Sequence, residues 1–216
     1  MNRVVLMGPP GAGKGTQAKR LAQEFDMLHL SSGDILRTER ASGSELGRQL
    51  KSYMDAGALV PDATVVEIMA GAVAGVPESK GLLLDGFPRT VNQAQALDAQ
   101  LARLGKPLQA VLVIEAPDAV IVERIAGRRS CPNCGKVYHV KYLPAKDNRC
   151  DDCPCELVQR PDDTQAVILA RLAAYHQQTA PVIDYYVRLG RCVRRIDGTG
   201  SPDQVTAEAG RALRGP

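Results

Sequence analysis

The chain has 216 residues, of which 44% are hydrophobic and 24% are charged, with a formal net charge of +3. This length and composition are typical of one globular core with inserted subdomains. The small net charge argues against a general nucleic-acid-binding or membrane-binding surface, and no apolar run reaches the length of a transmembrane helix. The first predicted strand begins at the N-terminus and leaves no room for a secretory signal, so we expect a cytoplasmic protein.

A glycine-rich segment lies between the first predicted strand, Val4–Met7, and the first predicted helix. It reads Gly8-Pro9-Pro10-Gly11-Ala12-Gly13-Lys14-Gly15-Thr16. Glycines at this spacing let backbone N–H groups converge on a phosphate, and Lys14 adds a point charge. The segment is therefore predicted to be a phosphate-binding loop. Gly15 separates Lys14 from Thr16, so Thr16 need not be a direct metal ligand.

The first helix follows this loop. Its expected apolar positions are Leu21 and Phe25, and its expected exposed positions are Gln17, Lys19 and Arg20. A short strand over Leu28–Leu30 comes next.

Residues 31–75 are predicted to be helical and to contain no further strand. Ser32 is the predicted N-cap of the first helix in this segment. A second helix is expected over residues 42–55, and a third starts at Pro61-Asp62. In a protein built on a sheet, such a segment is expected to be an insertion over one edge of the site.

The remaining strands alternate with helices. An apolar strand ends at Asp85, and further strands are expected over Gln109–Ile114 and Cys192–Ile196. Helices are expected over residues 90–104, 117–127, 160–188 and 202–213. Asp162 and Gln165 resemble a capping box, and Pro181 should kink its helix. This alternation predicts a three-layer α/β core with a parallel sheet, and Asp85 at a strand's carboxyl end is predicted to serve a metal.

A Cys-rich segment interrupts this alternation, with the pattern C-x2-C-x15-C-x2-C at Cys131, Cys134, Cys150 and Cys153. Two such pairs can hold Zn²⁺ tetrahedrally, and four thiolates leave no open position, so the predicted zinc is structural. The segment is too small for a core of its own, which makes a metal staple reasonable. Cys155 is an alternative to Cys153 as the fourth ligand, and His139 is a less favoured one.

The zinc-ribbon spacing also permits a second functional class, a nucleic-acid-binding module attached to a phosphate-loop core. Arg128, Arg129, Lys136 and Lys141 would supply its positive charge. Aromatic residues make up only 4% of the chain, so few side chains are available for stacking on bases, and we favour an enzyme that binds no nucleic acid.

Five blocks of the sequence closely resemble adenylate kinase, in the expected order and over nearly the whole chain. They are Gly8–Thr16, Ser32–Arg37, Asp85–Thr90 with Gln93, Gly127–Arg129 and Arg160–Asp163. The resemblance implies a P-loop NTPase core with a five-stranded parallel sheet. It also implies reversible phosphoryl transfer from ATP to AMP, giving two ADP, with Mg²⁺, in adenine nucleotide homeostasis.

The resemblance divides the chain into a core, residues 1–30, 76–127 and 162–216, and two inserts. Residues 31–75, the helical insert, would bind the nucleoside monophosphate. Residues 128–161, the lid, would have the long form with a zinc site.

The resemblance also assigns residues by matching positions. The implied catalytic residues are Lys14, Asp85, Arg89, Arg128, Arg160 and Arg171. The implied ATP-binding residues are Gly11, Ala12, Gly13, Lys14, Gly15, Thr16, Arg124, Arg128, Tyr138 and Gly200. The implied AMP-binding residues are Ser32, Arg37, Met54, Leu59, Val60, Gly86, Arg89, Gln93, Arg160 and Arg171.

These roles have a physical basis, because arginine forks match phosphate oxygens and a phosphate acceptor that is already anionic needs no general base. A different acceptor, such as UMP, CMP or GMP, stays open because base choice depends on few contacts. We expect a monomer.

Overall fold

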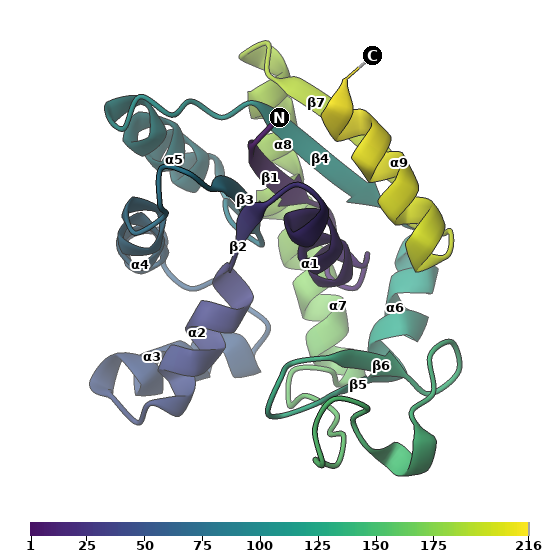
Figure 1. Ribbon diagram of the computed structural model, residues 1–216. Coiled ribbons are helices and arrows are strands. Elements are labelled where there is room, and N and C mark those ends of the chain that lie inside the picture. The colour runs from purple at the N-terminus through teal and green to yellow at the C-terminus, as the bar shows by residue number, and fades with distance from the viewer. Residues whose placement is uncertain (216) are drawn as a thin grey trace.

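The centre of the computed structural model, which describes residues 1–215, is a sheet of five parallel strands (Figure 1). The strands are β1 (Arg3–Met7), β2 (Met27–Ser31), β3 (Gly81–Asp85), β4 (Ala110–Glu115) and β7 (Cys192–Asp197). They pair in the order β2-β3-β1-β4-β7. The α/β fold with a five-stranded parallel sheet predicted from the sequence is confirmed.

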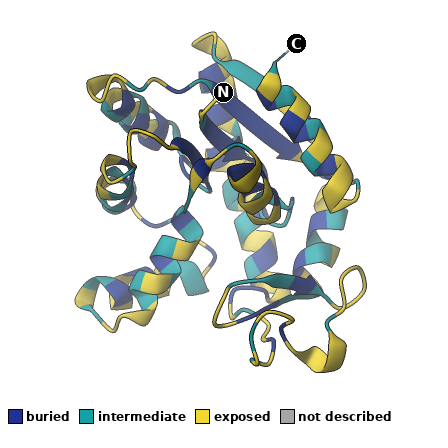
Figure 2. Cartoon of the chain, viewed as in Figure 1, coloured by how far each residue is buried: buried dark blue, intermediate teal, exposed yellow. Residues whose placement is uncertain are grey.

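Alternate residues of the strands enter two different hydrophobic cores, because successive side chains of a strand point to opposite faces. On one face, Val5 and Leu84 pack with residues of α4 (Asp62–Ala74), α5 (Val91–Arg103) and α8 (Ala180–Arg188). On the other, Val4, Leu6 and Leu83 pack with α1 (Lys14–Glu24) and α9 (Pro202–Arg214). Figure 2 shows the resulting buried sheet between helical layers.

Two inserts extend from the same side of this core (Figure 1). The helical insert contains α2 (Ser32–Ala41), α3 (Glu45–Asp55) and α4. The lid contains an antiparallel pair, β5 (Arg128–Ser130) and β6 (Val137–His139), and a single 3₁₀ turn, η1 (Lys146–Asn148). It is joined to the core by α6 (Asp118–Ala126) on one side and by the segment that leads to α7 (Gln165–Ala174) on the other.

Several local predictions were wrong because the neighbours of a residue decide its role. Gln17 is buried against the start of α9, where its side-chain amide donates to the carbonyl of Pro202 at 2.9 Å. The N-cap of α2 is Ser31, whose hydroxyl accepts from the amide of Asp34 at 3.2 Å, and Ser32 is the first helical residue. The second insert helix begins at Glu45 and not at residue 42.

The helix predicted from residue 160 begins only at Gln165, with Thr164 as its N-cap. The predicted capping box of Asp162 and Gln165 is therefore absent from this part of the described chain. The predicted disturbance at Pro181 is present, because a π-helical turn, η2 (Tyr175–Thr179), separates α7 from α8 just before this proline. Proline lacks an N–H and crowds the carbonyl four residues earlier, which is where this turn lies. Among residues 1–215, no helix has the length and apolar character that crossing a membrane requires.

Candidate active site

The phosphate-binding loop joins the carboxyl end of β1 to α1. Gly8, Gly11 and Gly13 have positive φ values of 138°, 82° and 100°, a backbone region that glycine enters without penalty. At Gly8 a side chain is also excluded by contact, because a Cβ would lie 2.1 Å from the carbonyl oxygen of Ile114. Gly13 begins α1 without a side-chain cap, so the first N–H groups of the helix remain available to an anion.

The ammonium of Lys14 lies inside this loop. It donates hydrogen bonds to the carbonyl oxygens of Gly8 and Pro9, both at 2.7 Å. Burial lowers the pKa of Lys14 to about 7, and the nearby carboxylate of Asp85 opposes this shift. Lys14 thus lies at the centre of the loop with its charge only weakly stabilised, which favours the approach of an anionic group.

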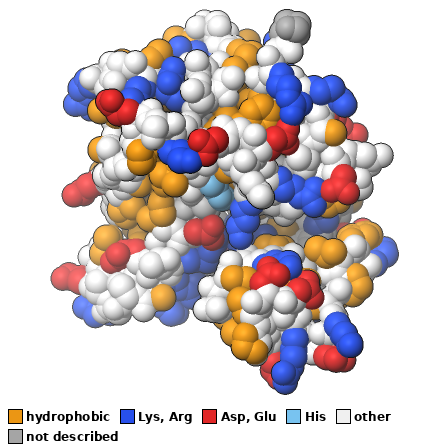
Figure 3. Space-filling model, in the orientation of Figure 1, with side chains coloured by type: hydrophobic (Ala, Val, Ile, Leu, Met, Phe, Trp, Pro, Cys, Tyr) orange, Lys and Arg blue, Asp and Glu red, His pale blue; other side chains and the backbone are white. Residues whose placement is uncertain are grey.

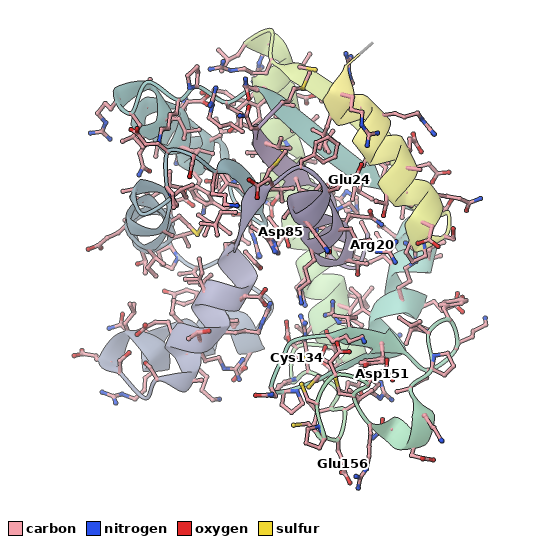
Figure 4. The ribbon with its side chains drawn as sticks, viewed as in Figure 1. Arg20, Glu24, Asp85, Cys134, Asp151 and Glu156 are labelled. Atoms are coloured by element: carbon pink, nitrogen blue, oxygen red, sulfur yellow. The ribbon has the colours of Figure 1, made fainter. Side chains whose placement is uncertain are left out.

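Asp85 is the last residue of β3 and lies at the carboxyl edge of the sheet (Figure 4). Only 7% of it is exposed, and one carboxylate oxygen lies 3.4 Å from Nε2 of His29. A Cβ on Gly15 would lie 3.6 Å from the same carboxylate, so Asp85 borders the first turn of α1. Carboxylate oxygens are ligands that Mg²⁺ prefers. The donor and its place beside the phosphate loop therefore fit a magnesium ion carried by a nucleotide.

A cavity of about 600 Å³, its open mouth included, lies between the helical insert and the core. Every residue predicted for the AMP site except Arg160 lines it. These are Ser32, Arg37, Met54, Leu59, Val60, Gly86, Arg89, Gln93 and Arg171. Sequence reasoning missed further lining residues, among them Gly57 and Asp162. Gly57 has a φ of 70° and packs against the backbone of Val167 in α7, which a Cβ would approach to 3.0 Å.

Polar side chains at the base of this cavity are held by bonds to their neighbours. The hydroxyl of Ser32 donates to the carbonyl of Gly86 at 2.6 Å. The Gln93 amide accepts from the backbone N–H of Arg89 at 2.7 Å and donates to the carboxylate of Asp62 at 2.8 Å. One amide hydrogen and one lone pair of Gln93 remain for a ligand. Gln93 is thus fixed in orientation, as a residue that reads the edge of a base should be.

A second cavity, of about 530 Å³ with its mouth, borders the phosphate loop at Gly8, Pro10 and Lys14. It shares Gly57, Leu59, Gly86, Arg89 and Arg171 with the first cavity. The two spaces therefore meet at Arg89 and Arg171. A group transferred from one cavity to the other would pass these two guanidinium groups.

The arginines of the site lie close enough to influence each other. Burial lowers the pKa of Arg89 to about 10, with Arg171 the next cause, and it lowers the pKa of Arg160 to about 10, with Arg128 the next cause. All remain charged at neutral pH. Figure 3 shows Lys and Arg side chains bordering the groove between the two inserts. Such a concentration of positive charge is stabilised by bound polyphosphate.

Two carboxylates that sequence reasoning did not assign hold these arginines. Asp163 is 1% exposed and accepts two hydrogen bonds from Arg128, one of them from Nε at 2.8 Å. Asp162 accepts from Arg171 at 2.8 Å. The block Arg160-Pro161-Asp162-Asp163 was visible in the sequence, but its spacing does not reveal that the two acids pair with Arg171 and Arg128. Arg160 donates to the hydroxyl of Ser130 at 2.9 Å.

Three predicted ATP-site residues lie at the lid side of the molecule. Arg124 donates to the carbonyls of Gly198 at 2.7 Å and Thr199 at 3.3 Å, so its guanidinium lies beside the loop that contains Gly200. Tyr138 is only 3% exposed, and its hydroxyl donates to the carboxylate of Asp151 at 3.0 Å. Tyr138 is thus held inside the lid.

The thiols of Cys131, Cys134, Cys150 and Cys153 come together in the lid, all within 4.8 Å of one another. The Cys134 and Cys150 sulfurs are 3.6 Å apart, against about 3.8 Å for two sulfurs in a tetrahedron of Zn–S bonds. The donor set and its spacing therefore fit Zn²⁺. Figure 4 shows Cys134 and Asp151 in this part of the lid.

A family model described as adenylate kinase matches residues 6–191 of the chain. The chain is 48% identical over 206 residues to an adenylate kinase from Kosmotoga olearia, and the match covers 95% of each chain. It is 47% identical over 214 residues to an adenylate kinase from Caldanaerobacter subterraneus subsp. tengcongensis, covering 99% of this chain and 96% of the relative. The chain belongs to the adenylate kinase family.

Membership in the adenylate kinase family agrees with the two adjacent cavities, one of which borders the phosphate loop. In this family member the helical insert lines one cavity, the phosphate loop lines the other, and Arg89 and Arg171 border both. The positions of Asp34 and Arg37 give weaker support for a phosphate site. Their side chains form an ion pair at 2.5 Å at the start of α2, so Arg37 has a carboxylate partner within its own helix.

Proposed function

We propose that this protein transfers the terminal phosphoryl group of ATP to AMP, giving two molecules of ADP, and that it catalyses the reverse reaction. The observation that carries the proposal is the junction of the two cavities at Arg89 and Arg171, with Lys14 on one side. ATP would bind by its phosphates at residues 8–16, and AMP would bind in the cavity of the helical insert. Full-length similarity to adenylate kinases supports both assignments.

In this reaction the phosphate of AMP attacks the terminal phosphorus of ATP, and ADP leaves from the other side. The attacking oxygen is already anionic, so no side chain has to remove a proton. The chain contributes position and charge: the loop N–H groups and Lys14 hold the ATP phosphates, and Arg89 and Arg171 lie between the two nucleotides. Arg128 and Arg160, which border the lid, would complete the positive surroundings and help to exclude water, the competing acceptor.

Magnesium bound to the ATP phosphates would neutralise charge on their oxygens. Asp85 is the residue that would hold it, through water, because its carboxylate borders the first turn of α1. Zinc would bind in the lid, and its role would be structural. Held by Cys131, Cys134, Cys150 and Cys153, it would fix the fold of the lid and take no part in phosphoryl transfer.

The acceptor is tested by measuring kcat/KM for AMP, GMP, CMP and UMP with ATP. AMP is expected to be preferred strongly, because the fixed amide of Gln93 presents one donor and one acceptor to the base edge, and a mismatched base leaves these groups unpaired. A higher kcat/KM for GMP or CMP would leave a nucleoside-monophosphate kinase with another acceptor. Binding of single-stranded nucleic acid without any phosphoryl transfer would instead support the zinc-ribbon alternative and contradict the proposal.

We also propose that the protein acts as a cytoplasmic monomer. The small net charge supports small-molecule substrates. It argues against a nucleic-acid or membrane partner. Size-exclusion chromatography with light scattering at several protein concentrations tests the oligomeric state.

A further inference from the structure

One histidine of the lid bonds to both sides of the junction between the lid and α6. His139 is the last residue of β6, and it lies opposite Arg128 in the pairing of β5 with β6. Its Nδ1 lies 3.0 Å from the backbone N–H of Lys141 and 3.2 Å from that of Tyr142. Both groups are donors, so Nδ1 is the acceptor and the proton of the neutral ring is on Nε2.

That Nε2 lies 3.3 Å from the backbone carbonyl oxygen of Glu123, in the last turn of α6. The carbonyl can only accept, so Nε2 donates to it. The imidazole therefore connects a turn of the lid to a carbonyl near the end of α6. The same carbonyl also accepts the backbone N–H of Gly127 at 3.1 Å, so the imidazole donates to its second lone pair.

The backbone of Gly127 is shaped to admit this ring. A Cβ at residue 127 would lie 2.3 Å from Nε2 of His139, so the ring could not keep this position beside any other residue. The carbonyl of Gly127 accepts the N–H of Val140 at 3.0 Å, directly after the histidine. The ring also stacks on that of Tyr142 with a centroid distance of 4.5 Å. Glycine at this position is thus required by the close approach of the lid.

The side chain of Glu123 adds two further links. Its carboxylate accepts from Lys141 Nζ at 2.8 Å and from the Tyr142 hydroxyl at 2.5 Å. Exposed pairs of this kind contribute little one at a time. Here they join the same two segments as the histidine does, so residues 123–127 and 139–142 are connected by four hydrogen bonds.

The last turn of α6 also contains Arg124, which bonds to the loop at Gly198 and Thr199, and it leads directly into Arg128. We propose that His139 is a positioning residue that fixes the lid to the end of α6, so that Arg124 and Arg128 are presented to ATP as one unit. The proposal rests on the proposed function, because both arginines are assigned to the ATP site. It adds a residue that touches neither nucleotide.

Three substitutions separate this role from simple stabilisation of the turn. His139→Ala removes all three hydrogen bonds of the imidazole. His139→Asn can keep the acceptor that bonds the amides of Lys141 and Tyr142, but it cannot reach Glu123. His139→Gln places an amide donor near the Nε2 position and loses the turn acceptor. His176→Ala is the matched control, because His176 also contacts α6, through Asp118 at its other end.

We expect His139→Ala to raise the KM for ATP about tenfold, which corresponds to about 1.4 kcal/mol, because the loosened junction presents Arg124 and Arg128 less accurately. The KM for AMP should change less than twofold, because the helical insert is not part of this junction. His139→Gln should recover most of the ATP affinity and His139→Asn should not. His176→Ala should behave as the parent protein, and all four variants should keep their zinc.

Rescue by His139→Asn but not by His139→Gln would show that the histidine serves only the turn, and would overturn the proposal. Equal changes in the KM for ATP and for AMP, or no change in either, would overturn it as well. Amide hydrogen exchange of residues 140–142 gives a readout that does not depend on turnover. Faster exchange in His139→Ala, together with a parent protein that transfers no phosphate, would keep the junction and reject the proposed function.

Discussion

The helical insert shares its hydrophobic core with the central sheet, whereas the lid has a small core of its own. Leu36, Leu50, Val65 and Met69 of the insert belong to the same buried cluster as Val5 of β1 and other strand residues. The buried cluster of the lid consists of Cys131, Tyr138, Cys150 and Leu157. The helical insert is stabilised by burial of apolar side chains in the core of the protein. The lid has thiols at positions where a larger domain would have aliphatic side chains.

Because of this difference, the lid and the helical insert are expected to lose their structure in different ways. A segment that shares the core loses stability together with the core, whereas one that depends on a metal can unfold by itself. The lid contains Arg128 and Arg160, which are proposed to bind the phosphates, while the insert lines most of the cavity proposed for AMP. The two halves of the site can therefore be perturbed separately, and neither supplies Lys14.

The largest expected effect is at Lys14, which belongs to the core. Lys14→Met should lower kcat/KM roughly 100-fold or more, because the variant loses a charge that contacts the transferring phosphate. The fold should be retained, since the bonds of Lys14 are confined to its own loop. Steady-state kinetics beside a thermal melt test this, and a folded variant with normal turnover would remove the phosphate-loop assignment.

The next effect concerns the insert that shares the core. Leu50 is 1% exposed, so Leu50→Ala should lower the free energy of unfolding by about 2–5 kcal/mol. Chemical denaturation measures this, and the zinc content should not change. Leu169→Ala is the control, because this leucine is 53% exposed on α7. If Leu50→Ala destabilised only residues 31–75 and left the main transition in place, the insert would be independent of the core.

A smaller effect on the main transition is expected when zinc is removed. The purified protein should hold about one Zn²⁺ per chain, and chelation should abolish amide protection in residues 128–161 while residues 31–75 stay protected. Activity should fall only as far as Arg128 and Arg160 are misplaced. Hydrogen exchange with mass spectrometry resolves the two inserts. Simultaneous loss of protection in the lid and in the helical insert would contradict the view that only the lid depends on zinc.

Serine variants identify the ligands of that zinc. Cys150→Ser should lose zinc, and Cys155→Ser should keep it, because the thiol of Cys155 lies outside the cluster of four. Metal analysis of the purified variants is sufficient. Retention of zinc by Cys153→Ser with its loss from Cys155→Ser would assign the fourth ligand to Cys155.

The fold could be predicted because strand, loop and helix patterns are local. The sheet strands, the phosphate loop and the residues around the AMP cavity follow from runs and motifs that are continuous in the sequence. The failures involve partners distant in sequence. The burial of Gln17 depends on α9, almost a whole chain away, and the roles of Asp162 and Asp163 depend on Arg171 and Arg128. A capping box was predicted at Asp162 because spacing alone does not reveal a salt bridge.

The smallest expected effect is the uptake of one proton by Lys14 when ATP binds, which is not expected when AMP binds. Burial lowers the pKa of Lys14 to about 7 in the free protein. A polyphosphate beside the ammonium favours its charged form and raises this pKa. Above pH 7 the free protein therefore holds Lys14 mainly neutral, and binding of ATP takes up a proton. At pH 6 the ammonium is already charged, so no uptake is expected there. ATP affinity should accordingly fall as the pH rises from 7 to 9.

Calorimetric titrations at pH 8.5 in two buffers of different ionisation enthalpy measure this uptake. ATP should take up close to one proton in the parent protein and none in Lys14→Met. AMP should take up none at Lys14, because this lysine lines the cavity at the phosphate loop and is absent from the residues that line the AMP cavity within the described chain. Equal uptake with ATP in the parent protein and in Lys14→Met would assign the proton to another group. In that case the loop lysine would already be fully charged before the nucleotide arrives, and its burial would be too slight to matter.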